Sequence, residues 1–179
     1  MQLILSKSII RSYRPEDAPS ATKHIGSYNV VKNMSLVPYP YTLDHAIEWI
    51  TRSTASNPET HFAIAIDDEV VGGIGLELAD PKRTCVSRYV AELGYWLGES
   101  LWGRGIMSEA VFAFTEWGFA NLDLLRIHAA VYARNPASAR ILAKAGFAFE
   151  GRLRACYFKE GEIIDGLMFA KIRERPAAM

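Results

Sequence analysis

The glycine-rich segment at residues 98–105 constrains the fold of this chain more than any other feature. A strand pattern at Val90–Leu97 precedes it, and apolar residues recur at helical spacing from Ser108 to Phe119. A second strand pattern follows at Arg126–Tyr132. An alternation of strand and helix in this order predicts a sheet with helices packed on it.

The remaining patterns extend this sheet on both sides. Further strands are expected at Leu3–Tyr13, His61–Ile66, Val70–Leu78, Glu150–Phe158 and Glu162–Ile172. Further helices are expected from Pro15 to near Gly26, from a Thr42 cap through Ile50, and at Pro136–Ala145. With 179 residues and no internal repeat, the chain is predicted to form one α+β domain, 1–179, around a mixed sheet.

Charge and cysteine content exclude several classes of function. Lys plus Arg and Asp plus Glu number 20 each, which argues against a nucleic-acid partner, because such proteins carry a basic excess. The apolar start is interrupted at Ser6–Ser8 and is too short to span a bilayer, so no membrane partner is expected. Cys85 and Cys156 do not make a disulfide framework or a zinc-ligand pattern. We therefore predict a cytoplasmic protein with no metal site.

The glycine-rich segment has the chemistry of an anion cradle. A helix N-terminus leaves backbone N–H groups unpaired, and glycines let a ligand approach those groups closely. The pattern Gly103-x-Gly105 lacks the third glycine of a dinucleotide fingerprint, since Ser108 stands there. A P-loop pattern is also absent. A simple turn remains the alternative to a phosphate-binding loop.

The segment WLGESLWGRGIMSEA, residues 96–110, resembles the pyrophosphate-binding segment of the GNAT acetyltransferases. Gly105 matches that motif, and Trp102 is the variant found in the ribosomal-protein alanine N-acetyltransferase branch. Met107 departs from the small residue expected there. Blocks similar to that branch occur in the same order elsewhere, at residues 38–50, 135–147 and 149–165.

The resemblance implies a GNAT fold, with a mostly antiparallel sheet that splays between strands 90–97 and 126–132 and is flanked by helices. It implies an acetyl-CoA-dependent N-acetyltransferase that acts on a primary amine by direct attack. A catalytically silent acyl-CoA-binding sensor of the same fold is the alternative. The cofactor-binding residues it implies are Tyr95, Trp96, Leu97, Trp102, Gly103, Arg104, Gly105, Ile106, Met107, Ser108, Asn135 and Ser138.

Acyl transfer to an amine requires a base, a donor to the oxyanion and an acid for the leaving thiolate. Glu92, on the strand lining the expected gap, is the candidate base; a structural salt bridge is its alternative role. The oxyanion donor is expected from a backbone N–H near Tyr95–Leu97, freed by a β-bulge. A buried strand end is the other interpretation of that run.

Ser138 is the candidate acid, and Tyr157 is a second candidate whose simpler role is packing. Asn135 caps the helix that follows it and is expected to reach the pantetheine arm. Arg140 and Lys144 face either the 3′-phosphate of coenzyme A or solvent.

The acceptor is the least defined partner in the sequence. A peptide N-terminus and a small amine both remain open, and so does a homodimer. The amine is expected to approach near the first two helices and Tyr39–Tyr41, on the side opposite the cofactor. His128, inside an apolar strand, is expected to be a core residue.

Overall fold

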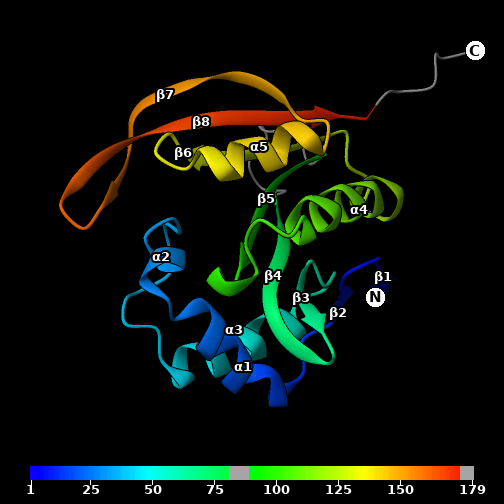
Figure 1. The fold of residues 1–179 in the computed structure, drawn as a ribbon. Coiled ribbons are helices and arrows are strands. Elements are labelled where there is room, and N and C mark those ends of the chain that lie inside the picture. Colours follow the sequence, from blue (N-terminus) through cyan, green and yellow to red (C-terminus); the bar gives the residue numbers. More distant parts are fainter. Residues whose placement is uncertain (81–88, 174–179) are drawn as a thin grey trace, which may run out of the picture.

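The computed structural model, drawn in Figure 1, describes residues 1–80 and 89–173 and contains one eight-stranded sheet. Its strands are β1 (Gln2–Ile4), β2 (Ile9–Arg11), β3 (His61–Ile66), β4 (Glu69–Leu78), β5 (Val90–Leu97), β6 (Arg126–Tyr132), β7 (Ala148–Lys159) and β8 (Glu162–Ile172). They lie in the order β1-β2-β3-β4-β5-β6-β8-β7. Only β5 and β6 pair in parallel within the described sheet. The predicted mixed, mostly antiparallel sheet is confirmed.

Helices cover both faces of this sheet. They are α1 (Ala18–Ile25), α2 (Tyr28–Val31), α3 (Leu43–Ala55), α4 (Ile106–Asn121) and α5 (Pro136–Lys144), with 3-10 turns at Pro15–Asp17 and Glu99–Leu101. The main apolar cluster joins α4 to the sheet, with Phe114 fully buried at its centre. A smaller cluster around Ala21 and Ile50 joins α1 and α3 to the other face. The sheet is therefore a middle layer between two helical layers (Figure 1).

Two predicted boundaries are wrong near the N-terminus and the glycine-rich loop. The expected strand Leu3–Tyr13 is a hairpin, because the polar residues at 6–8 make a turn closed by the Leu5 N–H and the Ser8 carbonyl at 2.9 Å. Helix α4 begins at Ile106 instead of Ser108. Its N-cap, Gly105, has a φ of 80°, a left-handed conformation that costs glycine little.

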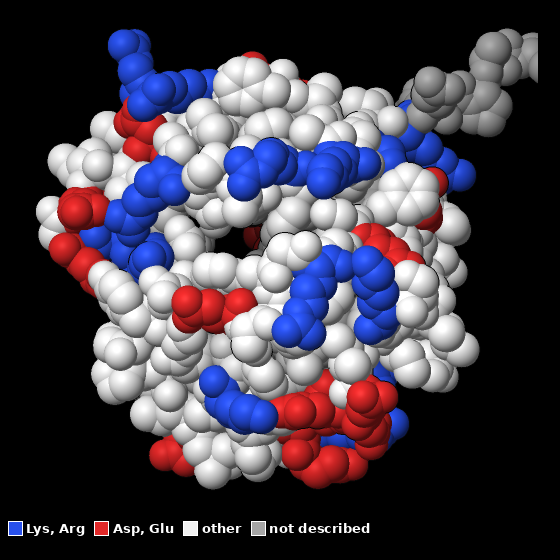
Figure 2. Space-filling view, viewed as in Figure 1, with Lys and Arg blue, Asp and Glu red and all other residues white. Residues whose placement is uncertain are grey.

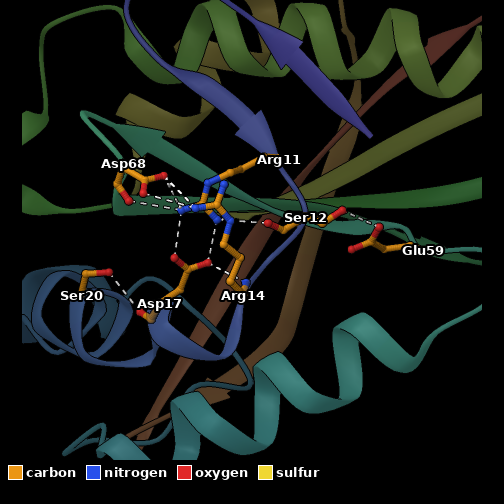
Figure 3. Close-up of polar contacts among 7 residues, drawn as sticks. All are labelled: Arg11, Ser12, Arg14, Asp17, Ser20, Glu59 and Asp68. Carbon is orange, nitrogen blue, oxygen red and sulfur yellow. Dashed lines mark hydrogen bonds and ion pairs between the residues drawn. The ribbon is translucent and has the colours of Figure 1, made fainter.

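A buried ion pair ties β2 to the start of α1. The Arg11 guanidinium donates to both carboxylate oxygens of Asp17, at 2.7 and 2.9 Å, and to the Asp68 carbonyl at 3.2 Å (Figure 3). Both side chains are less than 10% exposed. The Asp17 carboxylate also accepts from the Arg14 backbone N–H. Such a bidentate pair holds its partners in one geometry, so it fixes the helical layer of α1 against the sheet.

No helix within residues 1–80 and 89–173 is long and apolar enough to cross a membrane. In the same part of the chain, no group of three or more His, Cys, Asp or Glu side chains is placed to hold a metal ion. Cys156 is free and exposed, and Cys85 lies outside the described residues.

Candidate active site

The two central strands separate after three residue pairs. Strands β5 and β6 are in register from Val90 opposite Arg126 to Glu92 opposite His128, and no further. Where they diverge, the structure contains a cavity of about 530 Å³, a volume typical of ligand sites. Figure 2, viewed as in Figure 1, shows an opening in the molecular surface with red Asp or Glu atoms inside it. Glu92 is the one Asp or Glu among the described residues that line the cavity.

The cavity brings together nearly all of the predicted site residues. Those that line it are Glu92, Tyr95, Trp96, Leu97, Trp102, Gly103, Gly105, Ile106, Met107, Ser108, Asn135, Ser138 and Tyr157. Arg104 belongs to the loop but does not line the cavity, and its side chain is exposed to solvent. Both Arg140 and Lys144, exposed on α5, lie at its margin.

Alternation along β5 divides the cavity between the two faces of the sheet. Leu93 and Leu97 belong to the main apolar cluster with α4. Successive strand residues point to opposite faces, so Glu92 and Trp96 point to the face that carries α1 and α3. A Cβ built on Gly73 would meet both Trp96 and Tyr13 of the smaller cluster, which places Trp96 on that face. The gap therefore connects an α4–α5 face with an α1–α3 face.

The glycine-rich loop is held to its surroundings by three contacts. The Trp102 indole N–H donates to the Leu97 carbonyl at 2.8 Å, which pins the loop to the end of β5. Lys7, from the β1–β2 turn, donates to the Arg104 carbonyl at 2.7 Å. Ser6 of the same turn donates its backbone N–H and hydroxyl to the Glu109 carboxylate in the first turn of α4. The loop is thus held at the cavity wall by Trp102 and from outside the cavity by Ser6 and Lys7.

The expected β-bulge in β5 is absent. The β4–β5 register runs without a shift from Leu78 opposite Ala91 to Gly72 opposite Leu97. Unpaired backbone groups arise instead from the departure of β6. The Gly98 N–H donates towards β4, to the Val71 carbonyl, so alternation turns the backbone groups of Tyr95 and Leu97 towards the gap.

Helix α5 supplies a serine next to a phenol. Asn135 caps the helix, and its side-chain oxygen accepts from the Ser138 N–H at 3.2 Å. The Ser138 hydroxyl lies 2.7 Å from the Tyr95 hydroxyl. Burial raises the pKa of Tyr95 to about 12, against the opposing effect of that hydrogen bond. Sequence reasoning placed Tyr95 in the site through its backbone and missed its side chain.

On the α1–α3 face, Glu92 is exposed to the cavity and has no ion-pair or hydrogen-bond partner among the described residues. His128 stands opposite it in the register, with a buried Nδ1 that lacks a partner in the described structure. Burial lowers the pKa of His128, partly offset by the Glu92 charge. His128 does not line the cavity. It was expected to be a core residue, but it is half-buried and belongs to neither apolar cluster of the described residues.

Tyr157 lies across the gap from Glu92. Its ring packs against Tyr132 with centroids 4.9 Å apart. Burial, with the charges of Cys156 and Glu92, raises its pKa to about 12. The phenol therefore stays protonated at neutral pH, which is compatible with packing and with proton donation.

The far end of the cavity is formed by a segment that sequence reasoning missed. Val30 and residues 33–35 line it, whereas the expected Tyr39–Tyr41 segment does not. The tip of the β7–β8 hairpin holds this segment: the Lys159 ammonium donates to the Met34 and Val37 carbonyls at 3.0 and 2.9 Å. Helix α2 has only four residues, too few to produce a periodic signal in the sequence.

Comparison with known proteins decides the family. The chain matches the family described as "Acetyltransferase (GNAT) domain" over residues 7–148. It belongs to the GNAT acetyltransferase family. The uncharacterized N-acetyltransferase p20 of Bacillus licheniformis is 30% identical over 98% of both chains. The ribosomal-protein-serine acetyltransferase of Escherichia coli is 32% identical, over 62% of this chain and 59% of its own length.

The fold comparison agrees with this GNAT assignment. RimL, a ribosomal L7/L12 alpha-N-protein acetyltransferase solved in complex with coenzyme A, superposes with a TM-score of 0.82 at 19% identity. The match covers 95% of this chain and 96% of RimL. The protein is thus an acetyl-CoA-dependent N-acetyltransferase of the GNAT family.

The cavity of this acetyltransferase fits acetyl-CoA in two respects. First, the loop contains two glycines with positive φ, Gly103 at 76° and Gly105 at 80°. Second, the first N–H groups of α4 have no partner within the helix. Free N–H groups at a helix N-terminus are a common binding site for phosphate groups. Met107, the departure from the family motif, is 4% exposed and packs in the main cluster, so its size does not obstruct the loop.

Proposed function

We propose that this acetyltransferase modifies the α-amine of a peptide, with Glu92 as general base and Ser138 as general acid. The observation that carries the proposal is the position of Glu92. It is an unpartnered carboxylate at the last β5–β6 residue pair, on the face opposite the cofactor loop. A carboxylate in a structural salt bridge would have a partner, and Glu92 has none among the described residues.

The charges around the cavity favour a peptide over other amines. Apart from Glu92, the charged residues among those lining it are Arg140 and Lys144, both on the cofactor side. A polyamine would need several carboxylates to neutralise it. A free amino acid would bring a carboxylate to a region whose one charged side chain is acidic. The α-amine of a peptide requires only one carboxylate. Its pKa of about 7.7–8.0 is low enough for a carboxylate to deprotonate it through water.

In the proposed reaction, Glu92 takes the proton of the incoming amine, directly or through water. Backbone N–H groups of β5 that face the gap, at Tyr95 and Leu97, donate to the carbonyl oxygen as negative charge develops on it. Ser138 gives its proton to the departing sulfur, and Tyr157 is the second candidate for this step. Asn135 orients Ser138 and, through its side-chain amide, contacts the pantetheine arm.

The proposed cofactor contacts follow the loop and helix α5. The N–H groups from Gly103 to Ser108 would hold the pyrophosphate, and the edge of β5 from Tyr95 to Leu97 the pantetheine arm. Arg140 and Lys144 are placed for the 3′-phosphate. Arg104, whose carbonyl is bound by Lys7, contributes through its backbone. Residues 1–179 are taken as one catalytic domain acting in the cytoplasm, where free cysteines are stable.

A thiol-release assay with matched acceptors tests the peptide assignment. The acceptors are a short neutral peptide with a free N-terminus, the same peptide with a formylated N-terminus and one lysine, the free first amino acid, and spermidine. The free α-amine is expected to give a kcat/KM at least tenfold above the others, because a lysine side chain titrates near 10.4 and resists deprotonation. Faster turnover of the amino acid or of spermidine would overturn the assignment. Binding of acetyl-CoA without turnover on any amine would favour a sensor.

A further inference from the structure

The Tyr95 side chain links the two walls of the cavity. It starts on β5 and reaches α5, where its hydroxyl lies 2.7 Å from the Ser138 hydroxyl and 3.3 Å from the Ser138 carbonyl oxygen. Both residues line the cavity. Ser138 is 8% exposed, and its hydroxyl has no second hydrogen-bond partner among the described side chains.

The two hydroxyls share their protons in one of two ways. If Tyr95 donates to the Ser138 oxygen, the serine proton is left free to point into the cavity. If Ser138 donates to Tyr95, the phenol proton turns to the Ser138 carbonyl. Both arrangements use the 2.7 Å contact between the hydroxyls, and the second adds only a long contact of 3.3 Å to the carbonyl. The first arrangement matches the acidity of the two groups, because a phenol is a stronger acid, and so a stronger hydrogen-bond donor, than an aliphatic hydroxyl.

Burial also keeps the phenol in its donor form. With a pKa raised to about 12, Tyr95 stays protonated wherever the enzyme is expected to work. The helix cap fixes the other end of the serine, since the Ser138 backbone N–H is already bound to Asn135. The backbone of Ser138 is thus held by the cap of α5, and its hydroxyl is held by Tyr95 on β5.

We propose that Tyr95 is a positioning residue that acts through Ser138. Its phenol donates to the serine oxygen and leaves the serine proton directed into the gap, towards the sulfur that leaves. In the transfer step the Ser138 O–H bond breaks and its proton forms an S–H bond with the departing thiolate. The serine oxygen takes the proton that the Tyr95 phenol donates across the 2.7 Å contact, and the phenol then recovers a proton from solvent. This inference rests on the acid role proposed above for Ser138.

A double-mutant cycle on the full-length enzyme tests the coupling. The variants are Tyr95→Phe, Ser138→Ala and the double mutant, measured for kcat, for acetyl-CoA affinity and for melting temperature. Tyr95→Phe keeps the partly buried ring and removes the hydroxyl contact to Ser138, so kcat should fall about fivefold with acetyl-CoA affinity unchanged. Ser138→Ala should lower kcat by roughly ten- to a hundredfold. In the Ser138→Ala background, Tyr95→Phe should have no further effect.

Tyr28→Phe is the matched control. It removes another tyrosine hydroxyl, bound to Glu160 on the surface at 2.7 Å, and should leave kcat unchanged. Independent effects of Tyr95→Phe and Ser138→Ala would overturn the positioning role while leaving Ser138 as the acid. Wild-type turnover in Ser138→Ala would remove the acid role and this inference together. A fall in acetyl-CoA affinity alone in Tyr95→Phe would assign the phenol to binding.

Discussion

The two faces of the gap between β5 and β6 are built differently. On the α4–α5 face, polar groups are held by partners within the chain: the loop by Lys7 and Trp102, and Ser138 by Asn135 and Tyr95. On the α1–α3 face, Glu92 has no such partner among the described residues, and the segment at residues 33–35 is held through the hairpin tip.

This difference agrees with the proposal that the α4–α5 face binds acetyl-CoA and the α1–α3 face binds the amine. The same cosubstrate binds in every turnover, so groups that are already in place for it lower the free-energy cost of ordering on binding. A carboxylate that accepts a proton must stay free to receive it, so a partner would oppose its task. The comparison predicts that substitutions on the two faces separate acetyl-CoA binding from the chemistry of the acceptor.

The largest effect is expected at Glu92. Glu92→Gln keeps the size of the side chain and removes the base, so kcat should fall about 10²–10⁴-fold while acetyl-CoA affinity is retained. A thiol-release assay measures kcat, and a binding titration measures the affinity for acetyl-CoA. A kcat equal to that of the wild type would assign Glu92 to structure.

A substitution in the loop on the other face should act on the cosubstrate. Gly105→Val places a β-branched residue at a φ of 80°, and its Cβ would lie 3.2 Å from the Lys7 ammonium. The loop must then shift, and acetyl-CoA should bind at least tenfold more weakly, about 1.4 kcal/mol. Unchanged affinity in a folded variant would exclude the loop from the site.

Gly94→Val is the matched change on the acceptor face. Gly94 lines the cavity two residues from Glu92, and a Cβ built there meets nothing within 4 Å. The fold should tolerate valine in this strand, and the side chain should narrow the path of the amine. We expect KM for the peptide to rise about fivefold, about 1 kcal/mol, with acetyl-CoA affinity constant. Equal losses for both substrates would mean that the faces are not separate.

The smallest effect is expected at Trp102. Trp102→Phe removes the hydrogen bond to the Leu97 carbonyl but keeps an aromatic ring on a residue that is 45% exposed. One partly exposed hydrogen bond contributes at the low end of about 0.5–1.5 kcal/mol, so acetyl-CoA affinity should fall about threefold. A loss as large as that of Gly105→Val would mean that the indole itself contacts the ligand.

The sequence predicted the cofactor side better than the acceptor side, for physical reasons. Glycines before an amphipathic helix and Asn before Pro136 are local signals, and the loop and α5 lie where those signals placed them. The predicted bulge in β5 was wrong, and the backbone groups that face the gap are left by the departure of β6. That departure, like the Tyr95–Ser138 contact, depends on distant segments. Helix α2 was missed because four residues carry no period.

The central claim is that cosubstrate and amine reach the gap from opposite faces of the sheet and meet beside Glu92. A crystal structure with a conjugate that joins coenzyme A through an acetyl bridge to a peptide α-amine tests it most directly. The account predicts the pyrophosphate on the loop before α4, the sulfur next to Ser138, and the peptide leaving on the α1–α3 face past Glu92 and Gly94. A peptide that leaves on the α4–α5 face, or a linking nitrogen remote from Glu92, would contradict it.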